Sequence, residues 1–335
     1  MGSLAAAGAL SVGLLGCGGL DASEVAEYER LQPLSVSFVP APPGKPQREF
    51  YDLDWSPSQS ALVVSIGTAS AGQARAYLAM LRLDGSAPRR LAVPTEKECE
   101  TSEPFVPRAL RDGRIVHWSV CLGKTTRADR NLRTLRVYDP ERATAGRYVK
   151  RFFRLFDVGW FDFSPRSDAG VLSMGDALSN KLYWLEPSGL EQVDLPLTNV
   201  GDVHWSPDGR EVAVSGVPSK AGSDSPTRQD VPWSVFLVGS GEPREIISGL
   251  RDGAALDWSP DGRWLVLSTN VRGARSGLWL FRISTKELFL LREGNTFGGP
   301  VWLPDGRIVV PIGGAPDLGY RGRHGLELLR VRLPG

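Results

Sequence analysis

A short pattern recurs six times between residues 50 and 335, and it limits the possible folds of this chain more than any other feature. The full pattern is an aromatic residue, a tight turn and an aliphatic run, as in HWSPDGREVAVS from His204 and DWSPDGRWLVLS from Asp257, and the second copy has Ala109 at the aromatic position. The aligned positions of the aromatic residue are Trp55, Ala109, Phe163, Trp205, Trp258 and Trp302. Neighbouring copies are therefore 42 to 54 residues apart, and a period of this size is typical of β-propeller blades.

Each repeat has the sequence pattern of four antiparallel strands. Pro-Asp-Gly predicts a tight turn after the first strand, because Pro fixes φ, Asp accepts backbone hydrogen bonds and Gly supplies a positive φ. The aliphatic run after the turn predicts a second strand, and segments such as KLYWLE and PRRLAV predict a third and a fourth. We call the strands A to D from the centre outward. The sequence thus predicts an all-β, six-bladed propeller over residues 50–335.

The last repeat ends after its third strand, near Leu333, so its fourth strand must come from elsewhere. Residues 34–39 (LSVSFV) form a strand-like run outside any repeat. We expect them to close the ring, since closure removes an exposed sheet edge. Residues 21–32 are expected to form a short helix, because Asp21 and Glu24 have capping-box spacing. The Pro-rich residues 39–49 predict a stiff connector.

The N-terminus has the pattern of an export signal. Residues 4–15 form an apolar run of 12 residues, which is too short to span a bilayer. The run ends in Leu14-Leu15-Gly16-Cys17, which resembles the lipobox of bacterial lipoproteins. This resemblance implies that residues 1–16 are a signal peptide, that Cys17 is acylated and that residues 17–49 form a lipidated N-terminal segment. The alternative is a generic apolar N-terminus with an unrelated cysteine.

The same resemblance sets an expected location. A protein acylated at Cys17 is exported and anchored to a membrane by its lipid. In a Gram-negative cell, Gly18 after the cysteine favours the periplasmic side of the outer membrane.

The repeat itself resembles that of the TolB-type propellers. Trp205-Ser206-Pro207-Asp208-Gly209 and its counterpart from Trp258 to Gly262 match the WSPDG motif in full. The second copy has lost both the aromatic residue and the proline, and the first and third copies depart from Asp-Gly. The resemblance implies the fold of that family but not the role of TolB, because many unrelated proteins use this propeller.

Composition and motifs argue against several functions. The 39 basic and 38 acidic side chains leave a net charge of +1, without the basic excess that non-specific nucleic-acid binding needs. The strings H-E-x-x-H and G-x-S-x-G are missing, and three His and three Cys without metal-site spacing offer few ligands. The sequence therefore predicts no catalytic site, no metal and no cofactor.

The long loops of the predicted propeller collect on one face. The B–C loops at residues 122–131, 217–232, 271–277 and 313–325, and the D–A connection at 94–107, all emerge there. Binding residues often occupy loops on a rigid scaffold, so we expect an envelope protein or a glycan to bind this face. The candidate binding residues are Glu98, Glu100, Lys124, Arg127, Arg130, Asp224, Arg228, Tyr320, Arg321 and Arg323. The alternative is a set of tolerated insertions with local charge pairing.

Two cysteines lie in neighbouring elements of this face. Cys99 falls in the 94–107 connection, and Cys121 ends the second strand of the second blade. An oxidising compartment favours a disulfide between them. The alternative is two free thiols.

A second candidate site lies at the predicted central channel. Asp54, Asp162, His204 and Asp257 each precede the repeat aromatic, and they could ring the channel as in a lactonase-like or glycan-active propeller enzyme. The competing interpretation is structural, with these side chains fixing strand A through hydrogen bonds. We favour the structural interpretation, because Arg108 and Val301 interrupt the ring at the matching positions of blades 2 and 6.

Overall fold

The computed structural model describes most of the repeat region and part of the N-terminal segment. The described residues are 19–22, 28–43, 48–68, 76–95, 101–122, 133–147, 157–167, 169–175, 180–186, 189–219, 231–271, 277–294, 299–312 and 324–334. Over these ranges the chain forms strands and turns but no helix. A helix that could cross a bilayer is accordingly not found among them.

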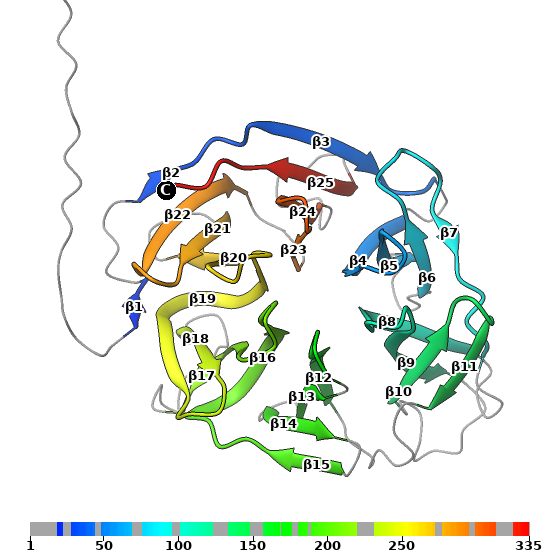
Figure 1. Cartoon of the computed structure of the whole chain (residues 1–335), viewed down its shortest axis with the longest axis horizontal. Helices are drawn as coiled ribbons and strands as arrows, with labels where there is room; N and C mark the ends of the chain where they lie inside the picture. Colours follow the sequence, from blue (N-terminus) through cyan, green and yellow to red (C-terminus); the bar gives the residue numbers. More distant parts are fainter. Residues whose placement is uncertain are drawn as a thin grey trace, which may run out of the picture.

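Six blades of four antiparallel strands surround a central axis, which confirms the predicted fold (Figure 1). Blade 1 comprises β4 (Arg48–Ser56), β5 (Ala61–Thr68), β6 (Ala76–Leu81) and β7 (Arg89–Arg90). Blade 2 comprises β8 (Thr101–Ala109), β9 (Ile115–Leu122), β10 (Arg133–Asp139) and β11 (Thr144–Arg147). Blade 3 comprises β12 (Asp157–Phe163), β13 (Gly170–Gly175), β14 (Asn180–Glu186) and β15 (Gly189–Gln192).

Blades 4 and 5 share one long strand. Blade 4 comprises β16 (Leu197–Trp205), β17 (Val212–Pro218), β18 (Trp233–Val238) and the first part of β19 (Arg244–Trp258). Blade 5 comprises the rest of β19, β20 (Trp264–Val271), β21 (Gly277–Arg282) and β22 (Glu287–Glu293). Residues 244–250 of β19 pair with β18, and residues 250–258 pair with β20. Blade 6 comprises β23 (Val301–Trp302), β24 (Arg307–Ile312), β25 (Gly325–Arg330) and β3 (Ser35–Pro40).

The A–B turns have the predicted geometry. In blade 4, Gly209 has a φ of +63°, and its N–H donates to the carbonyl of Ser206 at 2.8 Å. The Ser206 hydroxyl donates to Oδ1 of Asp208 at 2.7 Å, and the same oxygen accepts the Arg210 N–H at 3.1 Å. The Ser-Pro-Asp-Gly sequence therefore satisfies its own polar groups and positions the ends of strands A and B.

The hydrophobic core lies between neighbouring blades. Trp279 and Phe281 are fully buried in the cluster that joins blades 4 and 5. The repeat residue Trp258 is 4% exposed, and its indole N–H donates to the carbonyl of His204 in the preceding blade at 3.0 Å. The repeat aromatic thus links adjacent blades through packing and a hydrogen bond.

The N-terminal segment runs along the outer edges of blades 4, 5 and 6, and we call residues 19–22 and 28–41 the strap (Figure 1). Its first strand, β1 (Leu20–Asp21), pairs in parallel with β19 of blade 4. Its second, β2 (Glu29–Arg30), pairs in parallel with β22 of blade 5. Its third, β3, pairs antiparallel with β25 and completes blade 6. The closing strand expected at residues 34–39 is confirmed, displaced by one residue.

The helix expected over residues 21–32 is wrong for the described part of that range. Ala22 donates its N–H to the carbonyl of Ser248 at 2.7 Å, and Leu31 donates to Leu290 at 2.9 Å. The outer strands of blades 4 and 5 offer unpaired backbone groups along their edges. An isolated helix of this length is marginal in water. Strand pairing with the blades is therefore more favourable than the helix that the capping-box spacing of Asp21 and Glu24 predicted.

Candidate functional site at the centre of the ring

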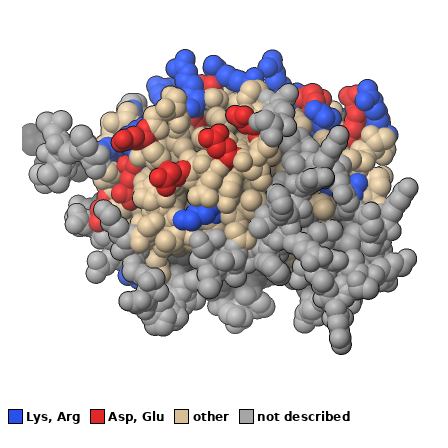
Figure 2. Space-filling view, turned by 90° about the horizontal axis from the view of Figure 1, so that it is seen from below, with Lys and Arg blue, Asp and Glu red and all other residues tan. Residues whose placement is uncertain are grey.

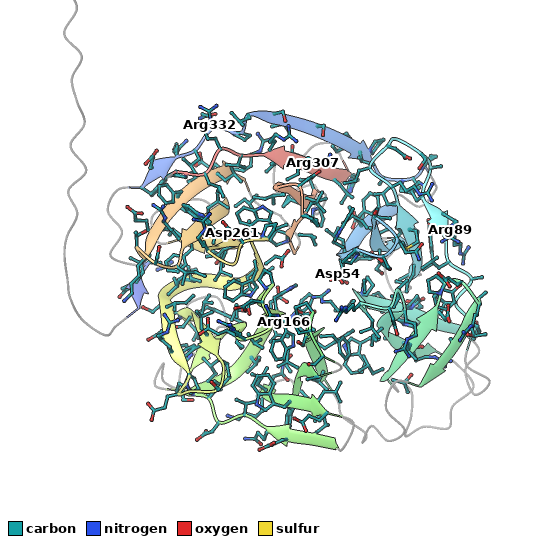
Figure 3. The ribbon with its side chains drawn as sticks, in the orientation of Figure 1. Asp54, Arg89, Arg166, Asp261, Arg307 and Arg332 are labelled. Atoms are coloured by element: carbon teal, nitrogen blue, oxygen red, sulfur yellow. The ribbon has the colours of Figure 1, made fainter. Side chains whose placement is uncertain are left out.

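A cavity of about 350 Å³ opens at the axis on the side of the A–B turns, and we call it the axial funnel. Its wall is built from the aromatic and proline residues of the repeats: Trp55, Phe163, Trp205, Trp258, Trp302, Pro57, Pro165, Pro207, Pro260 and Pro304. Its floor carries Asp54, Asp162, His204 and Asp257. Figure 3 shows Asp54 beside the axis, whereas Arg89 and Arg332 lie at the perimeter.

The structure brings the four predicted channel residues together. His204 Nδ1 lies 3.6 Å from Oδ1 of Asp257 and 4.0 Å from Oδ2 of Asp162. The imidazole also meets a carboxylate that sequence reasoning missed, with 3.4 Å between Nε2 and Oδ1 of Asp202. Asp202 and Asp52 both lie two residues before a channel position, so the alternation of side chains in a strand could have pointed to them.

Arg108 belongs to this cluster, which corrects the expectation that it interrupts the ring. Its side chain is 4% exposed, and its Nε lies 3.8 Å from Oδ1 of Asp162. Its Nη2 lies 3.3 Å from Nε2 of His204. The guanidinium therefore supplies positive charge where five carboxylates converge. Val301, the other interruption, lines the funnel without a charge.

A bulge in strand β8 lies next to Arg108. The register of β8 against β9 shifts between Phe105 and Arg108, and Val106 there has a φ of +47°, which is unusual for a β-branched residue. In blades 3 and 4 the corresponding bulges hold Gly159 and Gly201. The inner strand of blade 2 is therefore more strained than those of blades 3 and 4, and the strained residue lies two positions before Arg108, which the strand presents to the axis.

In blades 3 and 4 a serine hydroxyl fills the bulge. Ser173 accepts the N–H of Trp160 at 2.8 Å, and Ser215 accepts that of Asp202 at 2.9 Å. In blade 2 the bulge contains Pro107, which has no N–H to donate. His117 occupies the opposing position there and is fully buried, with its Nδ1 3.0 Å from the carbonyl oxygen of Trp118. Its place opposite the bulge agrees with a packing role for this histidine.

The floor carboxylates join adjacent blades. Asp54 accepts the N–H of Ala109 in blade 2 at 2.7 Å. Asp162 accepts the N–H of Trp205 in blade 4 at 2.7 Å. Asp202, two residues before His204, makes the same kind of hydrogen bond between blades: its Oδ2 accepts the N–H of Leu256 in blade 5 at 2.9 Å. These are the hydrogen bonds that the structural interpretation of the repeat aspartate expects.

Burial and mutual charge set the protonation of the cluster. Burial raises the pKa of Asp52 to about 6 and that of Asp257 to about 6, against the lowering effect of nearby cations. Burial also raises the pKa of Asp54. Burial alone would raise the pKa of Asp202, but the imidazolium of His204 and the Arg108 guanidinium lower it. Burial would likewise depress the pKa of His204, yet the Asp202 carboxylate raises it to about 9.

The cluster therefore combines two basic groups, Arg108 and His204, with five carboxyl groups. In the parts of the chain that the structure describes, no group of three or more His, Cys, Asp or Glu is arranged to hold a metal ion. The funnel can hold a polar or cationic group against its aromatic wall, and Asp257 at its floor can exchange a proton near pH 6.

The other predicted site residues mostly lie outside the described residues. This holds for Cys17, Cys99 and all ten candidate residues of the loop face, namely Glu98, Glu100, Lys124, Arg127, Arg130, Asp224, Arg228, Tyr320, Arg321 and Arg323. The backbone of Cys121 lies in β9 opposite Ser102. The disulfide, the lipid site and the loop-face site thus stay predictions.

The opposite face of the disc, formed by the A–B and C–D turns, is rich in charge. Four A–B turns end in Asp-Gly-Arg, and in three of them the arginine Nε lies 2.6 to 2.8 Å from the aspartate of its own turn. The fourth pair, Arg210 with Asp208, is 3.5 Å apart. In the side view of Figure 2, Lys and Arg gather along the upper edge of the disc, and Asp and Glu lie mainly below them on its outer side.

Comparison with known proteins agrees with this fold. No family model matches the chain. The Tol-Pal system protein TolB of Nitratidesulfovibrio vulgaris is 31% identical over 174 residues, which cover 48% of this chain and 37% of that protein. This chain therefore spans little more than a third of the length of that curated relative.

Two solved structures extend the comparison to nearly the whole ring. TolB of Acinetobacter baumannii has a TM-score of 0.54 at 15% identity, covering 84% of this chain and 63% of that one. A gluconolactonase of Xanthomonas campestris has a TM-score of 0.53 at 16% identity, covering 92% and 99%. Likeness at this level of identity shows the fold alone. Together with the WSPDG repeats, it shows that the chain is a six-bladed β-propeller similar to those of TolB proteins.

Proposed function

We propose that this protein is a non-catalytic propeller of the cell envelope that binds a protein partner through the axial funnel. The observation that carries the proposal is the funnel itself, an aromatic and proline wall above a floor that carries three aspartates and one histidine. Aromatic side chains provide large contact area at low entropic cost. A partner segment that inserts a cationic side chain toward Asp54, Asp162 and Asp257 fits this chemistry.

Two further observations support an envelope role. The sequence of residues 4–17 predicts export and acylation at Cys17. The curated relative is named a Tol-Pal system protein. The proposed location is membrane-anchored, on the periplasmic side of the outer membrane in a Gram-negative cell. A glycan that binds the same funnel is the alternative partner.

A channel-centred enzyme is the alternative function. The observation in its favour is the pair of buried acids, Asp52 and Asp257, whose pKa values are raised to about 6, a range suited to general acid–base work. Against it, the Asp257 oxygens accept the backbone N–H groups of Trp258 and Trp302. A group held in this way is better suited to joining blades than to moving protons.

Site-specific photo-crosslinking tests which face binds the partner. A photoreactive side chain replaces Pro260 at the funnel mouth or, as a matched control, Glu242 in an exposed C–D turn. Funnel binding predicts crosslinks to one partner from Pro260 but not from Glu242. A third variant, in which the loop at residues 217–232 is shortened to a tight turn, tests the loop face. Loss of capture in this variant, with no crosslink from Pro260, would move the site to the loop face.

A further inference from the structure

The strap bears on how the propeller meets a membrane. Gly19 lies against the outer edge of blade 4, where a Cβ atom on it would come within 2.8 Å of the Ile246 carbonyl carbon. Leu20 and Asp21 then pair with Ile247 and Ser248, and Ala22 is fully buried. The chain is therefore pinned to the rim of blade 4 from Gly19 onward.

The predicted lipid site is only two residues from this rim in the sequence. Cys17 precedes Gly19 by two residues, so the chain between them spans at most about 7 Å. A lipid on Cys17 would hold the edge of blade 4 close to the headgroups, without a flexible linker.

The far end of the strap carries an apolar stripe. Leu34, Val36 and Phe38 are 57%, 49% and 40% exposed, and they are the only exposed large hydrophobic residues among those described. They alternate along β3, so they share one face of the outermost strand of blade 6. Contiguous apolar surface of this kind marks an interaction site in a protein of this class.

The surroundings of the stripe favour a lipid surface as its occupant. The exposed Arg332 lies at the perimeter beside β3 (Figure 3), whereas the exposed Arg330 lies opposite Ser35 and therefore on the other face of β3 from the stripe. Apolar side chains with an arginine close by fit an interface with anionic headgroups. Three side chains alone expose far less area than the roughly 800 Å² per partner that a stable dimer buries, which disfavours a second copy of the chain.

We infer that the rim covered by the strap faces the membrane, with the lipid at its blade 4 end and the apolar stripe at its blade 6 end. This inference rests on the lipid anchor of the proposed function. The disc then stands with its edge toward the bilayer, and the axial funnel opens sideways along the membrane surface.

Protease accessibility tests this orientation. A short protease recognition sequence is inserted either in the exposed C–D turn of blade 4, at residues 239–242, or in that of blade 2, at residues 140–143 on the far side of the ring. The acylated protein is reconstituted in vesicles of phosphatidylethanolamine and phosphatidylglycerol. We expect cleavage at blade 4 to be several-fold slower in vesicles than in detergent, with blade 2 unchanged. A flexible linker inserted between Gly18 and Gly19 should restore cleavage at blade 4. Equal cleavage at the two turns would overturn the inference.

Vesicle flotation tests the stripe independently of the anchor. Cys17→Ser protein produced from residue 17 onward, without the apolar residues 4–15, should bind the same vesicles weakly. The combined change Leu34→Ser, Val36→Ser and Phe38→Ser should abolish this binding while the melting temperature confirms folding. The inference fails if the Cys17→Ser protein does not float, or if it forms a dimer that the triple change removes. Mass spectrometry of the protein from cells decides acylation separately. An unacylated Cys17 would defeat the anchor but leave the flotation result standing.

Discussion

Asp257 in blade 5 accepts the backbone N–H of Trp302 in blade 6, with 2.6 Å between Oδ2 and the nitrogen. The other oxygen of the same carboxylate accepts the N–H of Trp258 at 2.8 Å. One side chain therefore joins the inner strands of two blades at the axis.

Replacing this carboxylate should loosen the ring. Asp257→Ala leaves two N–H groups without their acceptor, and such groups cost about 1–3 kcal/mol each when they stay dry. We expect the free energy of unfolding, measured in urea, to fall by about 2 kcal/mol in total. Asp194→Ala, at an exposed position outside the cluster, should change it little. Equal losses in the two variants would contradict the joining role.

Arg108 should be essential to the central cluster. Arg108→Met leaves the five carboxyl groups of the cluster with His204 as their only basic partner, and removing one partner of a buried charge network costs about 3–5 kcal/mol. We expect this loss at pH 7.5 and a smaller loss at pH 5.5, where Asp52 and Asp257 take up protons. Arg142→Met, in an exposed turn, is the control. A loss that is the same at both pH values would argue against the charge-balancing role.

His204 should make stability depend on alkaline pH. Its pKa is about 9 in the folded protein against 6.5 ordinarily. A raised folded-state pKa contributes stability fully below pH 6.5 and loses it as the pH rises through about 9. The contribution is on the order of 3 kcal/mol, since each pKa unit between these two values corresponds to about 1.4 kcal/mol. Urea unfolding between pH 6 and pH 10 should show this decline in the parent protein and a flatter curve in His204→Gln.

The strap should stabilise the ring in steps. Removing residues up to Gln32 deletes the buried Ala22 and the edge-to-face contact of Tyr28 with Trp279, whose ring centroids are 4.9 Å apart. Removing residues up to Val39 also deletes most of β3 and exposes the edge of blade 6. We expect the melting temperature to fall with the first truncation and further with the second, relative to a chain that starts at Gly19. A first truncation without effect would mean that β1 and β2 contribute nothing.

Cys99 and Cys121 are predicted to be joined. The bond would close a loop of about 20 residues and add about 3 kcal/mol in the chain-entropy model. Alkylation of protein unfolded without reductant should leave both cysteines unlabelled. Labelling of both would reject the disulfide.

The fold was predictable because its blades repeat a physical unit. In blades 4 and 5 the turn, as from Ser206 to Gly209, satisfies its own hydrogen bonds, so the same short sequence gives the same geometry in both blades. The closing strand was predictable because blade 6 has only three strands after residue 300. The two-residue strands β1 and β2 were not predictable, because their stability comes from the blade edges that they pair with and not from their own sequence.

The centre of the ring was predictable only in part. Asp54, Asp162, His204 and Asp257 share a repeat position, so alignment of the copies identified them. Arg108 sits at the same position, but the bulge beside it is a three-dimensional feature of blade 2. In the sequence, Arg108 therefore looked like a break in the ring of acidic residues. In the structure, its guanidinium is the counter-ion of those residues.

Strand β19 has a consequence for how this ring comes apart. Its 15 residues run without a break from the outer edge of blade 4 to the axis of blade 5. Its two halves pair with different strands, and the two pairings meet at Leu250, which lies opposite both Trp233 of blade 4 and Val271 of blade 5. We therefore expect the backbone amides at the two ends of β19 to exchange with solvent deuterium through separate openings, while Leu250 couples the opening of blade 4 to that of blade 5.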